Sequence, residues 1–480
     1  MHIIFVASEA TPLAKTGGLA DVVGSLPHAL KECGHNVRVI LPYYRKQIAA
    51  SGVQVKPLRQ NVAMFLDGLP RIIPLHEARV AGLRFVLVEQ DDLFDREGIY
   101  GPAGGEYADN LLRYTLLCRT ALEAACLSGE PVDIFHCHDW QTGLLPLLLD
   151  TQYRHRPEIT ATRCIFTIHN LAYQGVFSAD WLGRLGLPAS AFHPGCMEFY
   201  GQVNCLKAGI ASADQITTVS PSYAEEILTT EYGCNLDGFL QDHAHKLNGI
   251  VNGLDVDSWN PATDKMIASQ FGPGNIKGKR NCKMSLQHEL GLKNDEKAPL
   301  LAMVSRLAEQ KGVDLVVDNL LSWIGSGYQL AILGSGDPYF ERRMLELATE
   351  HPNQMAFFAG FNEKLARSIY AGADMFLMPS RFEPCGLSQL IAMRYGCIPV
   401  VRETGGLKDT VVDYGQFPDK ATGFSFIEDT ALSFHKAVQS AIEVFRKPKT
   451  WARIRTRAMR RDSSWNKSAK LYASTYKKGL

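Results

Sequence analysis

Short apolar runs alternate with helical patterns along the whole chain, and this alternation limits the folds that the sequence can adopt. In the first half, helical patterns such as 20–32 and 111–126 separate the apolar runs. Several runs are rich in Val and Ile on both alternating faces, which is typical of parallel strands covered by helices on both sides. The runs are 3–7, 37–41, 85–88, 134–136, 164–168 and 215–219.

The second half repeats this pattern, with apolar runs at 300–304, 329–333, 355–359, 375–378, 398–401 and 423–427. Such strand–helix alternation produces right-handed crossovers and an open, doubly wound sheet. The chain of 480 residues is too long for one core, and Gly and Asn punctuate a linker-like stretch, 246–261. We therefore predict an α/β protein with two Rossmann-like domains, 1–247 and 248–459. The tail 450–478 has a helical pattern.

The composition is that of a globular protein without a strong attraction for polyanions. Hydrophobic residues make up 46% of the chain and charged residues 21%, and 50 Lys and Arg balance 50 Asp and Glu. A zero net charge favours neither nucleic acid nor an anionic membrane as a partner, although a local basic patch stays open. No apolar stretch approaches the ~20 residues that span a bilayer, and the N-terminal run indicates a buried strand. We expect a cytoplasmic protein with no membrane or nucleic-acid partner.

The eleven cysteines do not form a disulfide framework. They are scattered, their number is odd, and no CxxC pair occurs, so a structural zinc site is not indicated either. Free thiols in a reducing compartment are the expectation.

The loops that follow strands are where a doubly wound fold binds its ligands. The first such loop has the sequence KTGGLADV. Gly17 and Gly18 let the backbone approach a ligand, the amides at the start of the next helix favour phosphate, and Lys15 adds a positive charge. This is not a Walker loop, and a tight turn with a solvated lysine explains the same residues equally well.

Two further strand ends carry histidines. The string HCHDWQTG holds Asp139, which can accept hydrogen bonds from sugar hydroxyls, and Trp140, whose ring can stack on a sugar. A metal site is an alternative, but no further ligands are evident. We interpret His136 as a satisfied core histidine. In HNLAYQG, His169 would point into the crevice, although a lone histidine is more often structural.

The second half places two cations and a carboxylate at strand ends. Arg306 and Lys311 follow the run 300–304, and together they can neutralise a departing pyrophosphate. A solvated surface pair is the alternative. In SRFEPCGLS, Glu383 lies between a strand end and a helix start, where it can anchor sugar hydroxyls or stabilise positive charge at an anomeric carbon.

Taken together, these strings resemble the family of bacterial glycogen synthases and plant starch synthases, glycosyltransferase family five. KTGGLADV, HDW, HNLAYQG, SRL, QKG and SRFEPCGL occur in the family's order and cover nearly the whole chain. The resemblance implies GT-B architecture, with two Rossmann-like domains facing across a cleft and a C-terminal helix, about 460–480, returning to the first domain. It also implies retaining transfer of glucose from ADP-glucose to the non-reducing end of glycogen or a malto-oligosaccharide, without metal or cofactor.

The resemblance further implies roles for individual residues. The catalytic set is Glu383, Asp139, His169, Arg306 and Lys311, and the nucleotide-sugar-binding set is Lys15, Gly17, Gly18, Asp21, Asn252, Phe361, Cys385, Gly386, Leu387 and Ser388.

Three positions depart from the family pattern. Gln141 stands where many members have His, and Phe361 stands where some have a Tyr that stacks on adenine. Ile391 occupies the place of a second Glu that contacts ribose in wider relatives.

Several other functions remain open at this point. A UDP-glucose-dependent transferase and a glucan phosphorylase would share the architecture. An NAD-dependent oxidoreductase is a further alternative, but the GxG turn at 334–336, after the run 329–333, lacks the third glycine of the dinucleotide fingerprint. A glucan-binding protein without activity would not need this set of charged residues.

Overall fold

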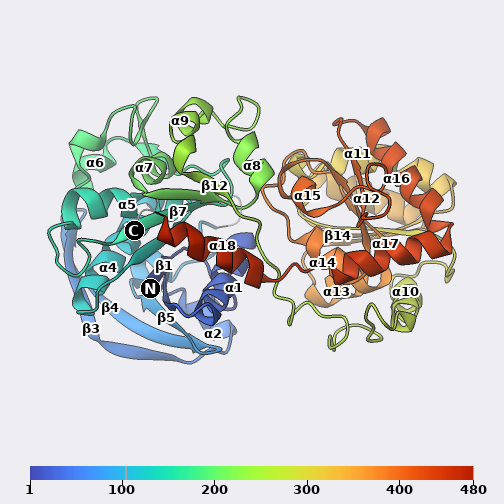
Figure 1. Ribbon diagram of the computed structural model, residues 1–480, viewed down its shortest axis with the longest axis horizontal. Coiled ribbons are helices and arrows are strands. Elements are labelled where there is room, and N and C mark those ends of the chain that lie inside the picture. Colours follow the sequence, from blue (N-terminus) through green and yellow to red (C-terminus); the bar gives the residue numbers. More distant parts are fainter. Residues whose placement is uncertain (103–104, 479–480) are drawn as a thin grey trace. The chain divides into compact units, whose positions relative to one another are not determined.

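The computed structural model describes residues 1–102 and 105–478 (Figure 1). The chain forms two compact units. The first consists of Met1–Gly253 together with the C-terminal segment from Trp465 onward, and the second is Leu254–Ser464. Each unit has its own sheet and its own apolar core.

The first unit is built on a nine-stranded sheet with the order β12-β11-β7-β6-β1-β2-β5-β4-β3. The strands are β1 His2–Val6, β2 Asn36–Pro42, β3 Val55–Leu66, β4 Leu69–Val80, β5 Leu83–Val88, β6 Ile134–His138, β7 Arg163–Ile168, β11 Gln215–Thr218 and β12 Leu247–Gly249. From β12 to β5 neighbouring strands are parallel, as the apolar runs predict.

The other edge of this sheet differs from the expected all-parallel arrangement. Strands β3 and β4 pair antiparallel with each other, and β4 pairs antiparallel with β5. Their half-exposed faces interrupt the apolar pattern, so no apolar run marks these two strands in the sequence. The stretch 246–261 was predicted to be a linker, but this is wrong for its first residues. Leu247–Gly249 form strand β12, which pairs with β11.

Helices and a small sheet surround the large sheet. The helices are α1 Gly18–Glu32, α2 Arg45–Ala50, α3 Asp91–Phe94, α4 Asn110–Leu127, α5 Leu144–Leu148, α6 Trp181–Arg184, α7 Cys205–Ser212, α8 Pro221–Glu226, α9 Asp237–Asp242 and α18 Trp465–Lys477. The small sheet has the order β8-β10-β9, from β8 Val176–Ser178, β10 Gln202–Asn204 and β9 Glu198–Phe199. A single 3-10 turn, η1 Trp140–Thr142, follows β6.

The C-terminal helix α18 completes the first unit's core, packing against α1 (Figure 1). Trp465, Tyr472 and Tyr476 are buried in that core. The Tyr476 hydroxyl lies 2.8 Å from His136 Nδ1, and Ser468 Oγ donates to the Val251 carbonyl over 2.6 Å. The helical tail predicted as one stretch is therefore two helices, because the chain leaves the second unit between α17 and α18.

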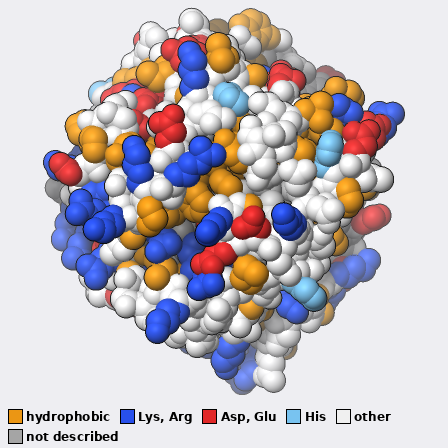
Figure 2. All heavy atoms as spheres, turned by 90° about the vertical axis from the view of Figure 1, so that its right-hand side faces the viewer, with side chains coloured by type: hydrophobic (Ala, Val, Ile, Leu, Met, Phe, Trp, Pro, Cys, Tyr) orange, Lys and Arg blue, Asp and Glu red, His pale blue; other side chains and the backbone are white. Residues whose placement is uncertain are grey.

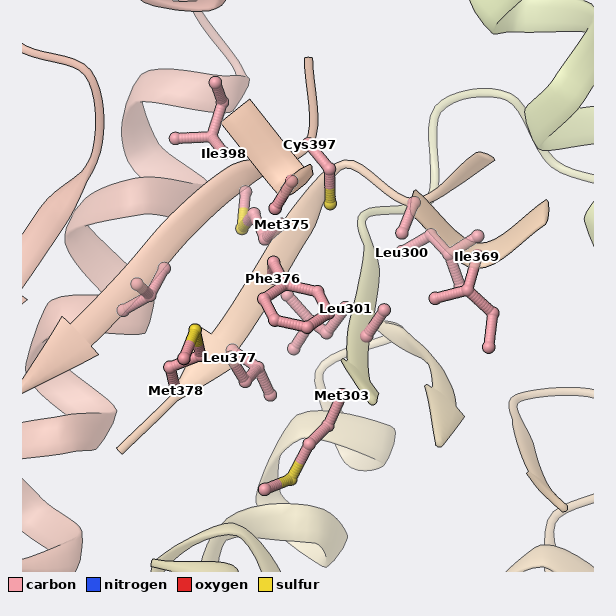
Figure 3. Close-up of a cluster of buried hydrophobic side chains, with 14 of the residues drawn as sticks. Leu300, Leu301, Met303, Ile369, Met375, Phe376, Leu377, Met378, Cys397 and Ile398 are labelled. Carbon is pink, nitrogen blue, oxygen red and sulfur yellow. The ribbon is translucent and has the colours of Figure 1, made fainter. Parts of the chain in front are cut away.

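The second unit has a six-stranded parallel sheet of order β15-β14-β13-β16-β17-β18. Its strands are β13 Leu300–Val304, β14 Gln329–Gly334, β15 Met355–Ala359, β16 Met375–Met378, β17 Ile398–Arg402 and β18 Phe424–Phe426. Figure 3 shows β13 and β16 side chains, among them Leu301, Met303, Phe376 and Leu377, packed together in the core beside Ile398 of β17. This doubly wound sheet agrees with the predicted class.

Three helices of the second unit, α12, α13 and α16, begin at side chains that cap them. Asp337, Asn362 and Thr430 each accept a hydrogen bond from a first-turn amide. The helices are α10 Lys277–Glu289, α11 Val313–Gly325, α12 Pro338–Glu350, α13 Glu363–Gly372, α14 Ser388–Arg394, α15 Gly405–Thr410, α16 Ala431–Phe445 and α17 Pro448–Arg460, with a 3-10 turn η5 Glu309–Lys311.

Basic side chains are unevenly spread over the second unit. The stretch 444–461, which contains α17, carries Lys and Arg but no Asp or Glu. Figure 2 shows Lys and Arg gathered on one side of the face at the right-hand end of Figure 1. Within the part of the chain that the structure describes, no helix is long and apolar enough to cross a membrane.

Candidate active site

A pocket lies at the carboxyl ends of β13 and β16 in the second unit, where a doubly wound sheet binds ligands. It encloses about 430 Å³ of empty space, part of it open to solvent. The residues that line it are Met303, Val304, Ser305, Arg306, Lys311, Leu377, Met378, Ser380, Glu383, Gly386, Leu387 and Ser388. Six of the residues singled out in the sequence are thus brought together.

An ion pair lies inside this pocket. Lys311 Nζ donates to Glu383 Oε2 over 2.6 Å, and Ser380 Oγ donates to the same oxygen over 3.1 Å. The Lys311 and Glu383 side chains are 18% and 9% exposed, so water screens this attraction only weakly. The Glu383 carboxylate therefore holds Lys311 at the pocket, and an anionic ligand would have to share that lysine with it.

Backbone contacts between two loops bring the ion pair together. Gly312 follows η5 with φ +64°, and a Cβ there would lie 2.1 Å from the Pro379 carbonyl oxygen. Only glycine allows this approach. The Arg381 amide donates to the Gln310 carbonyl over 2.9 Å, and the Arg381 guanidinium binds Asp314 at 2.6 and 2.7 Å. The loops after β13 and β16 are thereby joined on both sides of the pocket.

The pocket also offers donors that are open to a ligand. Arg306 is exposed, and among the described residues its guanidinium donates to Gln310 Oε1 alone, from Nη2 at 3.3 Å. The amides of Gly386, Leu387 and Ser388, before and at the start of α14, make no hydrogen bond to another described residue. Two cations and a row of free amides suit an anion with several oxygens, such as a diphosphate.

In the first unit, Asp139 is held in a strained conformation at the end of β6. Its φ is +55°, which is uncommon for a residue other than glycine. Its Oδ1 accepts a hydrogen bond from the His169 amide over 2.7 Å, which ties the ends of β6 and β7 together. Burial raises the pKa of the Asp139 carboxyl to about 7, and the negative charge of Glu9 adds to this effect. Asp139 thus titrates near neutrality.

Three histidine rings lie in a row of tilted contacts beside Asp139. His138 Nδ1 and His169 Nε2 lie 3.0 Å apart, so one ring donates a hydrogen bond to the other. Burial lowers the pKa of His169 to about 3 and that of His138 far below its usual range, so both rings are neutral. His136 is buried and bonded to Thr167 and Tyr476, which confirms its interpretation as a satisfied core histidine.

The KTGG loop differs from the expectation that its amides face a ligand. Glu9, only 3% exposed, accepts hydrogen bonds from the Thr16 amide at 2.5 Å and the Gly17 amide at 3.1 Å. The Lys15 ammonium pairs with Asp21 at 2.7 Å. A carboxylate of the protein therefore occupies two amides of this loop directly before α1, and sequence reasoning missed it because Glu9 belongs to no motif.

Three further candidate residues take different positions. The Asn252 side chain is buried, and its Oδ1 has no hydrogen-bond partner in the described part of the chain. Cys385 is buried directly before the free amides of the pocket. Phe361 follows β15, is 86% exposed, and does not line the pocket of the second unit.

A second pocket, in the first unit, has four aromatic side chains among its eleven lining residues. It encloses about 710 Å³ of empty space, part of it open to solvent. Its lining residues are Glu106, Trp140, Ala172, Tyr173, Gln174, Gly175, Val176, Phe177, Phe199, Cys234 and Asn235. Trp140 forms the floor: it is 4% exposed, and a Cβ on Gly175 would lie 2.4 Å from its ring. Its ring is therefore not freely available for stacking, contrary to our expectation.

Family models match both units. The model described as the starch synthase catalytic domain covers residues 2–242, and that of glycosyl transferases group 1 covers 288–458. Glycogen synthase 2 of Geobacter metallireducens is 46% identical over 99% of this chain and 98% of its own length. The chain belongs to the starch and glycogen synthase family. Glycogen synthase of Cellvibrio japonicus is 44% identical over 99% of both proteins.

Two solved structures have the same fold as this synthase. The catalytic domain of starch synthase IV from Arabidopsis thaliana, bound to ADP and acarbose, has a TM-score of 0.92 and 35% identity over 99% of both chains. Sucrose-phosphate synthase from Thermosynechococcus elongatus, at 18% identity and a TM-score of 0.59, shares the fold. The predicted GT-B class of two Rossmann-like domains is confirmed, and the synthase is a glycosyltransferase.

Sequence motifs found the charged residues of this synthase and part of its second pocket, because HDW contains Trp140 and HNLAYQG contains residues 172–175. Phe177 and Phe199 belong to short strands of the small sheet, without a regular apolar period. No signal in one sequence marks such scattered rings as neighbours. Among residues 1–102 and 105–478, no group of three or more His, Cys, Asp or Glu is placed to hold a metal ion.

Proposed function

We propose that this synthase transfers glucose from ADP-glucose to the non-reducing end of an α-1,4-glucan, glycogen or a malto-oligosaccharide, with retention of configuration. The observation that carries the proposal is the pocket where Arg306, Lys311 and the free amides of Gly386–Ser388 converge. The starch synthase with 35% identity was solved with ADP and with acarbose. The donor side is then the second domain, and the acceptor side is the first.

In this proposal the departing diphosphate is stabilised by fixed positive groups. Negative charge grows on the leaving oxygen as the bond to the anomeric carbon breaks. Arg306 and Lys311 supply charge there, and the amides add dipoles that need no reorganisation. Lys15, paired with Asp21 in the first unit, is proposed to move to the donor phosphates, while Phe361 stacks on the adenine.

The remaining candidate residues hold the reacting glucose. Asp139, His169 and Asn252 come from the first unit and Glu383 from the second. The neutral His169 ring can donate to a sugar hydroxyl, and its backbone carbonyl can stabilise positive charge at the anomeric carbon. No disulfide joins any of the eleven cysteines, all of which lie in the described residues, and this fits a reducing compartment such as the cytoplasm.

ADP-glucose is expected to be the preferred donor. With ADP-glucose and UDP-glucose at equal concentration, transfer to glycogen should be clearly faster from the adenine nucleotide, with EDTA present throughout. The exposed Phe361 ring is suited to a purine. The assay measures both the ADP released and the glucose incorporated into glycogen. A preference for UDP-glucose would favour the UDP-glucose-dependent transferase. Absorbance from a bound cofactor in the purified protein would instead favour a glucan phosphorylase.

Retention is proposed to occur on one face of the sugar, with the acceptor hydroxyl attacking as the diphosphate leaves. A phosphate oxygen takes the hydroxyl proton. The other route to retention requires a carboxylate that forms a covalent glucosyl-enzyme. Glu383 is poorly suited to attack, because Lys311 and Ser380 both bind its Oε2. Hydrogen bonding to glucose hydroxyls fits this carboxylate better.

Glu383→Gln is expected to lose most activity, because the neutral amide stabilises less positive charge and binds Lys311 less well. The parent enzyme should nevertheless accumulate no glucosyl-enzyme. Mass spectrometry of parent enzyme quenched with ADP-glucose and no acceptor tests this. A glucose adduct on Glu383 or Asp139 would refute the one-face mechanism, while an unmodified mass supports it.

A further inference from the structure

The His138 ring is buried at the end of β6, and its neighbours fix it there. The His138 amide donates to the Thr142 hydroxyl over 2.6 Å, and this hydroxyl donates to the His138 carbonyl over 2.9 Å. The ring stacks on Phe5, with centroids 5.2 Å apart, and its centroid lies 4.3 Å from that of His136. Close packing on this scale leaves a ring little room to turn. The directions of the two ring nitrogens are therefore set by the fold.

The two nitrogens of this ring have different surroundings. Nδ1 lies 3.0 Å from His169 Nε2. Nε2 is buried and has no hydrogen-bond partner in the described part of the chain. Because burial lowers the pKa of both histidines, each ring is neutral and carries a single N–H. Either His138 or His169 can donate across this contact, and the choice decides where both protons lie.

Two arrangements of the protons satisfy the contact. In the first, His138 donates from Nδ1, and its buried Nε2 is a bare lone pair. In the second, His169 donates from Nε2, and the His138 proton lies on Nε2 as a buried N–H without an acceptor. In protein interiors an N–H without an acceptor is rarer than an acceptor that lacks a donor. The first arrangement is therefore favoured.

We propose that His138 is a positioning residue that fixes the proton of His169 on Nδ1. When His138 donates to Nε2 of His169, the remaining proton of that neutral ring must lie on Nδ1. His169 Nδ1 makes no hydrogen bond to another described residue and, unlike His138 Nε2, is not buried. The inference rests on the proposed function, because it identifies the atom of His169 that donates to a hydroxyl of the reacting glucose.

Nitrogen-15 NMR of the parent enzyme, labelled in its histidines, measures the proton positions directly. Couplings between the ring nitrogens and the carbon-bound ring hydrogens distinguish a proton on Nδ1 from one on Nε2. His138→Asn and His169→Ala assign the two signals. We expect the proton on Nδ1 in both His138 and His169. A proton on Nε2 of His169 would overturn the inference, and this result does not depend on activity.

A double-mutant cycle separates positioning from a structural role. His138→Leu removes the donor, and kcat should fall about tenfold, equivalent to about 1.4 kcal/mol. The same substitution made in His169→Ala should lower the residual kcat no further. His138→Asn, whose amide nitrogen can take the place of Nδ1, should recover most of the activity. His245→Leu, at an exposed position of the first unit, is the control and should leave kcat unchanged.

An equal fall of kcat in the parent and in His169→Ala would contradict the inference, because His138 would then act on the fold and not through His169. An unchanged kcat in His138→Leu would contradict it as well. Failure of the proposed function looks different: the parent would transfer no glucose to any glucan, and the NMR measurement would still decide where the His169 proton lies. That measurement also decides if His138→Leu does not fold.

Discussion

Replacing Lys311 with alanine is expected to lower kcat about a hundredfold. Loss of one preorganised contact to developing charge typically costs about 3 kcal/mol. Lys311 also neutralises Glu383 at 2.6 Å, so the variant leaves a carboxylate at the place where the diphosphate must depart. Arg306→Ala should have a similar effect on kcat. The fold should survive both changes, because neither side chain belongs to the core.

Steady-state kinetics in ADP-glucose and glycogen, with circular dichroism on each variant, measures this. Lys364→Ala is the matched control: Lys364 is exposed on α13 of the same unit and lies outside the pocket. An effect confined to the donor KM, with kcat kept, would mean that Lys311 and Arg306 serve only ground-state binding.

Asp139→Asn should cost activity but increase stability at neutral and higher pH. In the variant a neutral amide replaces the Asp139 carboxylate that is proposed to bind the reacting glucose. We therefore expect kcat to fall about a hundredfold or more. The pKa of Asp139 is raised from 3.8 to about 7, so the folded protein holds this proton more tightly than the unfolded chain. The parent therefore loses stability as pH rises from about 4 to about 7, on the order of 4 kcal/mol.

Urea unfolding of parent and Asp139→Asn at pH 4.5 and pH 8 checks the sign. The two should be nearly equal at pH 4.5, and the variant should be more stable at pH 8. Asp242→Asn, an exposed position on α9 of the same unit, should show no such difference. A variant less stable than the parent at pH 8 would contradict the assigned burial effect. The rising limb of the parent's kcat/KM profile near pH 7 should also be absent from the variant.

The sequence predicted the parallel strands well because each is buried on both faces. Runs such as 300–304 and 375–378 became β13 and β16 without change. Arg306, Lys311 and Glu383 follow strands that pair in the folded sheet, and parallel strands end at the same edge. Their joint role was expected from the family resemblance, because β14 and β15 separate β13 from β16 in the chain and position alone does not show that the two pair.

What could not be predicted depends on contacts between distant residues. Glu9 occupies the Thr16 and Gly17 amides, although nothing in its neighbours marks it as a ligand of that loop. Strands β3 and β4 expose polar faces and so lack an apolar signature. Likewise, the raised pKa of Asp139 results from burial beneath side chains that only the folded chain assembles.

Helix α18 has a consequence for how the protein is made. Trp465, Tyr472 and Tyr476 belong to the core of the first unit, yet they follow all of the second unit in the chain. During synthesis of Leu254–Ser464 the nascent first unit therefore lacks the helix that packs against α1. The second unit, which is continuous in the chain, can finish folding before the first. The unit that translation begins is thus completed only after the other has been made.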